Sequence, residues 1–191
     1  NNRLQKLHMS VVGLMELREL SLMGNMMQRL PDDFTRLTKL EILHLDGQNF
    51  DSIPADITEQ GGKRILEYIR KMALADTTAT LDLSSMNVRQ LPSAVMLIVG
   101  LQHLFLHDNP IKRIPPMIAQ LTNLKTLTLN DTWVRSLPID LPELYQLKRL
   151  DLDLENMVFP PQEVCELGLN AIFSYLRKIL NGAIIGSLDL S

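Results

Sequence analysis

An apolar residue followed by proline recurs along the chain at a nearly constant spacing, and this period constrains the fold more than any other feature. The prolines, each preceded by Leu, Ile or Phe, are Pro31, Pro54, Pro92, Pro115, Pro138 and Pro160. They lie 23, 38, 23, 23 and 22 residues apart. Periods of about 20–50 residues are typical of proteins built from stacked repeats. The sequence therefore predicts a solenoid, whose long exposed face favours binding over catalysis.

Leucines at the first, fourth and sixth places of a nine-residue segment precede most of these prolines. Complete segments begin at Leu17, Leu40, Leu101, Leu124 and Leu147, and a further copy keeps Leu81 and Leu83. Residues two apart, such as Leu104 and Leu106, lie on the same side of a strand. No single copy encloses its leucines. We therefore expect the copies to stack into a parallel sheet over one shared apolar layer.

The pattern LxxLxLxxN, present in at least six copies, resembles the leucine-rich repeat family. The resemblance implies an α/β leucine-rich-repeat solenoid, with a curved parallel sheet on the concave side and irregular arms and two longer helices on the convex side. In this family an asparagine at the ninth place usually bonds the backbone of neighbouring turns. Asn2, Asn25 and Asn109 match that place, whereas Gln48, Met86, Thr132 and Glu155 depart from it.

A longer period of 107 residues relates the two halves of the chain. Ile65 and Tyr68, in an inserted segment near 57–75, are matched by Ile172 and Tyr175, in a segment near 164–181. Their spacing predicts helices with one apolar face, and Arg-Lys pairs are expected near the helix ends. We interpret residues 1–191 as a single domain of about two 107-residue, four-repeat units. We expect this domain to be a piece of a longer array.

The two inserted helices have alternative interpretations. The first is an enlarged return arm that packs on the convex side. The second is an amphipathic helix that binds a partner or a membrane surface. The segments also loosely resemble those that close repeat arrays in Roco-type proteins, a similarity that carries no GTPase residue.

Composition limits the function classes. A net charge of −3 disfavours nucleic-acid binding, which requires a basic surface. The single cysteine, Cys165, forms no internal disulfide, so we expect a reducing, cytoplasmic setting. No run of residues is long and apolar enough for a membrane span. Neither end resembles a capping repeat, which leads us to expect end-to-end self-association of the chain.

The side chains between the strand leucines are expected to point to solvent and to form the binding face. The residues on that face that we predict to contact a partner are Met23, His44, Asp82, His103, Phe105, His107 and Asp151. Phe105 is expected at the centre of a patch of His44, His103, His107, Asp46 and Asp82, because exposed aromatics are frequent binding hot spots. We expect Asp151, Asp153 and Asp189 to form an acidic patch towards the C-terminal end of the sheet.

We predict no catalytic residues, no cofactor and no metal site. Residues two apart on a strand are about 7 Å apart, too far for His103 and His107 to meet zinc at about 2 Å from one point. A hydrolase triad could in principle combine Ser84 or Ser85 with His107 and Asp82. The loop that such a triad needs does not accompany these residues. The predicted function is a protein–protein interaction module that binds through the concave sheet. Two alternatives stay open: a regulatory array of a larger kinase or GTPase, and an extracellular or pathogen ligand-binding protein.

Overall fold

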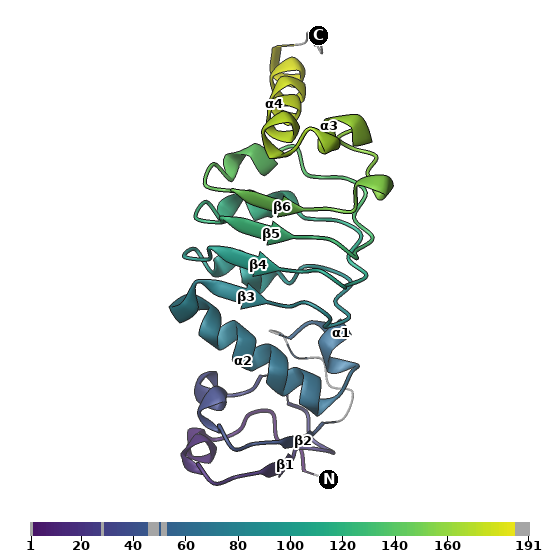
Figure 1. The fold of residues 1–191 in the computed structure, drawn as a ribbon. Helices are drawn as coiled ribbons and strands as arrows, with labels where there is room; N and C mark the ends of the chain where they lie inside the picture. Colours follow the sequence, from purple (N-terminus) through teal and green to yellow (C-terminus); the bar gives the residue numbers. More distant parts are fainter. Residues whose placement is uncertain (1, 28, 46–49, 51–52, 186–191) are drawn as a thin grey trace. The chain divides into compact units, whose positions relative to one another are not determined.

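The computed structural model describes residues 2–27, 29–45, 50 and 53–185, and the chain divides into two compact units, residues 1–74 and 75–191. The first unit contains a two-stranded parallel sheet, and the second a four-stranded parallel sheet in the order β3-β4-β5-β6 (Figure 1). The strands are Glu19–Ser21 (β1), Ile42–His44 (β2), Thr80–Asp82 (β3), His103–Phe105 (β4), Thr126–Thr128 (β5) and Arg149–Asp151 (β6). The predicted α/β solenoid of parallel strands is confirmed, while its interpretation as one domain stays a prediction.

The strands pair in a register that matches the 23-residue period. In the second unit Leu81, Leu104, Leu127 and Leu150 lie side by side on successive strands. The first three of these leucines are fully buried. Their neighbours Leu83 and Leu106, two residues along, are also fully buried. The leucines of successive coils therefore form the shared apolar layer that the period-two alternation predicts.

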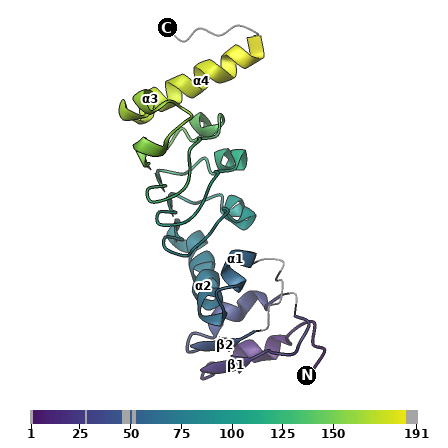
Figure 2. The same cartoon turned by 90° about the vertical axis from the view of Figure 1, so that its right-hand side faces the viewer.

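The repeating prolines mark where each return arm turns into a short helix. The 3₁₀ helices are Met9–Gly13, Asp32–Arg36, Ser93–Leu97, Pro116–Gln120, Leu141–Glu143 and Leu154–Asn156. The carbonyls of Pro31, Pro92 and Pro115 accept the first hydrogen bond of the turn that follows. Proline suits this place because its fixed φ matches the entry to a helix and its missing N–H is not needed there. Figure 2 shows these turns of the second unit stacked on one side of the coil.

Each inserted segment is a pair of helices separated by a short turn that ends in glycine. The pairs are Ala55–Thr58 (α1) with Gly62–Thr78 (α2), and Gln162–Glu166 (α3) with Leu169–Ile185 (α4). Gly61 and Gly168 separate the members, with φ of 86° and 90°. Glycine adopts this left-handed conformation without the steric cost that a side chain adds. The first residues of α1 and α3, and those of α2 and α4, are 107 residues apart.

The expectation that Arg-Lys pairs lie near the helix ends is wrong, because α2 and α4 run to Thr78 and Ile185 and have no basic residue in the last turn. Arg70 lies in the middle of α2 and donates to the carbonyls of Leu37 and Leu40, at 3.3 and 2.7 Å. Arg177 on α4 donates to the carbonyl of Pro142 at 3.3 Å. Each arginine thus bonds its helix to the backbone of the preceding return arm.

The start of α2 lies against the backbone of β2. A Cβ added to Gly62 would overlap the carbonyl oxygen of Leu43, so this place requires glycine. The corresponding residue of α4 is Leu169. Its side chain prevents the start of α4 from approaching a strand backbone as closely as Gly62 does. The helices of the two insertions begin at corresponding places, but the insertions differ in this backbone contact.

We predict that Gly62→Ala destabilises the protein, because a backbone carbonyl cannot move aside for a methyl group. Alanine is ordinarily better than glycine in a helix by about 0.5–1 kcal/mol, so the clash reverses the usual sign. The matched control is Gly100→Ala, where an added Cβ meets nothing within 4 Å. Thermal unfolding should give a lower midpoint for Gly62→Ala and an unchanged or higher one for Gly100→Ala. A rise in both midpoints would contradict the packing of α2 on β2.

Tyr68 on α2 is buried, and its hydroxyl has no hydrogen-bond partner among the described residues. Burial raises the pKa of the phenol to about 12, because the charged phenolate is poorly solvated. Below the ordinary pKa near 10 the neutral phenol is present in both the folded and the unfolded chain. Above it the unfolded chain loses the proton first, so stability falls as pH rises towards 12.

Tyr68→Phe removes this pH dependence. The unfolding free energy of the natural chain, relative to that of Tyr68→Phe, should fall by about 1.4 kcal/mol between about pH 9 and pH 11. At neutral pH the variant should be equally or more stable, since the lost hydroxyl has no partner among the described residues. Urea unfolding of both proteins at each pH measures the difference. Parallel pH curves would show that Tyr68 ionises as freely in the folded chain as in the unfolded one.

Candidate functional site

The outward side chains of β3–β6 and the residues directly after these strands form one surface of the second unit, here called the sheet face. It includes five of the residues predicted from sequence: Asp82, His103, Phe105, His107 and Asp151. They come from one sheet: Asp82 from β3, His103 and Phe105 from β4, His107 from the loop after β4, and Asp151 from β6. The structure thus brings these five residues onto one face.

Phe105 lies near the middle of the sheet face. In the strand register it stands between Asp82 on β3 and Thr128 on β5. Its side chain is half-buried, whereas Thr128 is only 4% exposed. The aromatic ring therefore lies among polar neighbours and is partly accessible to a partner.

Two histidines on either side of Phe105 are held by threonines of the next strand. Nδ1 of His103 shares a hydrogen bond with Oγ1 of Thr126 at 3.1 Å, and Nδ1 of His107 with Oγ1 of Thr128, also at 3.1 Å. The backbone N–H of Leu106 also donates to the Thr128 hydroxyl, at 3.3 Å. These bonds limit the freedom of the imidazoles before any partner arrives.

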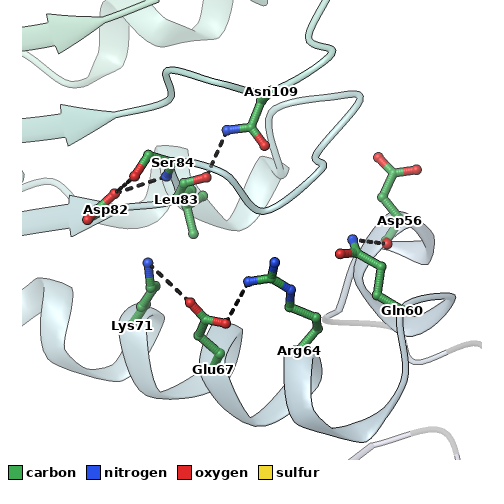
Figure 3. Close-up of polar contacts among 9 residues, drawn as sticks. All are labelled: Asp56, Gln60, Arg64, Glu67, Lys71, Asp82, Leu83, Ser84 and Asn109. Carbon is green, nitrogen blue, oxygen red and sulfur yellow. Dashed lines mark hydrogen bonds and ion pairs between the residues drawn. The ribbon is translucent and has the colours of Figure 1, made fainter.

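The acidic residues of the sheet face already have internal partners. Asp82 accepts hydrogen bonds from the N–H and hydroxyl of Ser84, at 2.9 and 2.6 Å (Figure 3). The carboxylate of Asp151 forms an ion pair with the guanidinium of Arg149, with 2.8 Å between Nη2 and Oδ2. This pairing raises the pKa of the arginine. The acidic patch predicted from sequence is therefore partly neutralised at Asp151, while Asp189 lies outside the described residues.

Met23 and His44 belong to the first unit. Met23 follows β1 and is 56% exposed, and His44 on β2 shares a 3.0 Å contact with the Glu19 carboxylate. β2 and β3 are in different sheets, so the proposed patch that joins His44 to His103 stays a prediction. Asp46, also assigned to that patch, lies outside the described residues.

The turns that follow the strands are fixed by a buried asparagine. Asn109 is 2% exposed, and its Nδ2 donates to the carbonyls of Leu83 and Leu106 at 2.8 and 2.9 Å. Its Oδ1 accepts from the N–H of Val88 at 2.8 Å, so one side chain bonds two successive coils (Figure 3 draws the Leu83 bond). Asp108, directly before it, has a left-handed φ of 55°.

Residues of different types occupy the ninth place of the other repeats, as the sequence predicts. Asn25 repeats the pattern in the first unit by donating to Leu22 and accepting from the N–H of Leu4. Thr132 bonds the carbonyl of Leu129 with its hydroxyl, at 2.6 Å. Met86 is fully buried and occupies the place with an apolar side chain instead.

The described residues contain no group of three or more His, Cys, Asp and Glu side chains that is arranged to hold a metal ion. Cys165 is buried, and its thiol lies 3.6 Å from the carbonyl of Pro160. Burial raises the pKa of this thiol, which keeps it protonated and a poor nucleophile. In the part of the chain that the structure describes, no helix has the length and apolar character needed to cross a membrane.

A groove along the loops that follow β3–β5 was not predicted from sequence. Its lining includes Arg89, Lys112 and Trp133. The signal that identifies it in the sequence is the 23-residue spacing of Arg89, Lys112 and Arg135 next to the only tryptophan.

Comparison with known proteins agrees with the repeat geometry. Residues 99–139, which contain β4, β5 and the arms that follow them, match the family described as Leucine Rich repeats (2 copies). Residues 99–139 are therefore leucine-rich repeats. Repeats of this family are generally protein-interaction modules.

Two solved structures are similar to parts of this chain. A leucine-rich repeat protein of Leptospira interrogans is 29% identical, with a TM-score of 0.45, over 87% of this chain and 38% of its own. A chain of the Toll–Spatzle complex of Drosophila is 18% identical, with a TM-score of 0.40, over 74% of this chain and 24% of its own. The present chain therefore spans less than half the length of either protein. No curated protein matches it.

Proposed function

We propose that the chain is a protein–protein interaction module that binds its partner through the sheet face of the second unit. The observation that carries the proposal is Phe105, a partly accessible aromatic ring flanked by histidines that hydrogen bonds hold in place. Binding hot spots are typically aromatic side chains near the centre of a contact, with polar groups around them. The parallel register supports the proposal because it sets these side chains on one rigid surface.

Preorganisation supports the same assignment. A side chain that orders only on binding costs about 0.5–1.5 kcal/mol, and this cost reduces affinity. On the sheet face, Asp82, His103 and His107 are already held by Ser84, Thr126 and Thr128. We place the first contact at Phe105 and these residues, with Asp151 and its partner Arg149 at the margin. Met23 and His44 are proposed as separate contacts of the first unit.

We also propose a reducing, intracellular setting, which the single cysteine of the sequence supports. Cys165 is buried and free in this fold. Its burial removes it from disulfide exchange with other chains.

We predict that Phe105→Ala combined with His107→Ala weakens partner binding by about thirtyfold, the size expected for removing a hot spot. The partner is first recovered with the natural chain and identified by mass spectrometry. It is then purified and titrated against each variant by calorimetry. Tyr145→Ala is the matched control, because Tyr145 is 66% exposed and lies outside the sheet face.

Circular dichroism must show that the double variant keeps its fold. An unchanged affinity in a folded double variant would exclude the sheet face around Phe105 as the binding site. If Tyr145→Ala weakened partner binding equally, this site would also be excluded, since the contact would then lie outside the sheet face.

A further inference from the structure

The loops after strands β3–β5 enclose a groove that is distinct from the sheet face. We call it the loop groove, and its lining combines apolar and basic side chains. The apolar part includes Pro110, Ile114, Pro116 and Trp133. A second hollow continues from it past Lys112 and Trp133 to Arg135. The strand ends that lead into these loops all point the same way in Figure 1.

Three cations of the loop groove occupy equivalent places in successive coils. Arg89, Lys112 and Arg135 are spaced by 23 residues, the period of the fold. The loops keep the register of the strands here, because Asn109 pairs with Thr132 and the N–H of Trp133 donates to Ile111 at 2.9 Å. Coils in such a register are about 4.8 Å apart, and like charges placed opposite one another are destabilising. An anionic partner would relieve that repulsion.

Part of this positive charge has no counterion among the described residues. The side chains of Arg113 and Arg135 make no ion pair or hydrogen bond within the described residues, and both are exposed. Lys112 Nζ lies 5.5 Å from the centre of the Trp133 ring, a cation–π contact that leaves the ammonium on the surface. The indole itself is 60% exposed. The groove therefore presents a large aromatic ring beside several available cations.

We propose that the loop groove binds an acidic peptide segment of a partner protein, with Asp or Glu side chains against Lys112, Arg113 and Arg135 and an apolar side chain against Trp133. Arginine is well suited to carboxylates because its planar guanidinium donates two parallel hydrogen bonds. The apolar floor of proline and isoleucine suits an extended chain rather than a folded domain. This site is independent of the sheet face.

Two carboxylates favour a peptide over a nucleic acid. Asp108 and Asp131 also line the loop groove. A continuous phosphate backbone, with a charge at every nucleotide, would meet these carboxylates as well as the cations. A peptide places its carboxylates at chosen positions and avoids them. The net charge of −3 also disfavours general polyanion binding.

The only tryptophan of the chain, Trp133, reports directly on the loop groove through its fluorescence. The probe is a short labelled peptide of glutamates around one phenylalanine, titrated into the full chain, with the same peptide made of lysines as charge control. We expect a saturable change in tryptophan emission with the glutamate peptide alone. The affinity should fall as salt is raised, because added ions screen exposed charges.

Charge-reversal variants test the assignment. Lys112→Glu and Arg135→Glu should each weaken peptide binding by about tenfold, as measured by anisotropy of the label. Lys148→Glu is the matched control, with the same change of charge at an exposed lysine before β6 that does not line the groove. Trp133→Ala should also weaken binding, whereas Phe105→Ala with His107→Ala should not. That last comparison separates this site from the sheet face.

Three results would overturn the proposal. The first is no saturable binding of the glutamate peptide. The second is equal weakening by Lys148→Glu, which would indicate general charge attraction. The third is tighter binding of a single-stranded RNA of mixed sequence at the same salt, which would assign the groove to a nucleic acid.

Discussion

The structure depends on successive coils meeting in one register, so that leucines from each coil share a dry layer. Leu81, Leu104 and Leu127 are fully buried, although each coil by itself leaves them open to water. Burying one leucine contributes about 1.5–3 kcal/mol, so the layer gains its stability only as coils are added. The same register fixes what faces outward. Phe105, its histidine neighbours and the loop cations are therefore placed by residues that never contact a partner.

Polar bonds between the coils complement this layer. Asn109 bonds the carbonyls of Leu83 and Leu106 and the N–H of Val88, so a single buried amide satisfies groups of two coils. A buried backbone group left without a partner is costly, which is why a polar side chain is required at this turn. Thr132 meets the need locally with its hydroxyl, and Met86 fills the same place with apolar volume. The fold accepts these substitutions because the leucine layer is retained.

The repeat period predicted much of this fold, since leucine spacing and strand pairing share the same interval of 23 residues. It also predicted that Phe105 and its neighbours face outward. It did not predict the helix breaks at Gly61 and Gly168, which depend on a single φ angle, or the break between β2 and β3, which are in different sheets. Nor did it predict the burial of Thr128 or the loop groove. Both depend on contacts between coils that a one-dimensional pattern does not record.

The most direct test of the account is the unfolding free energy of Asn109→Ala, measured by urea denaturation. Removing the amide leaves buried groups of two coils without partners, and we expect a loss of about 3 kcal/mol. Asn156→Ala, at an exposed asparagine, should change stability by less than about 0.5 kcal/mol. Equal stabilities for the two variants would contradict the claim that the coils are held in register by bonds between them.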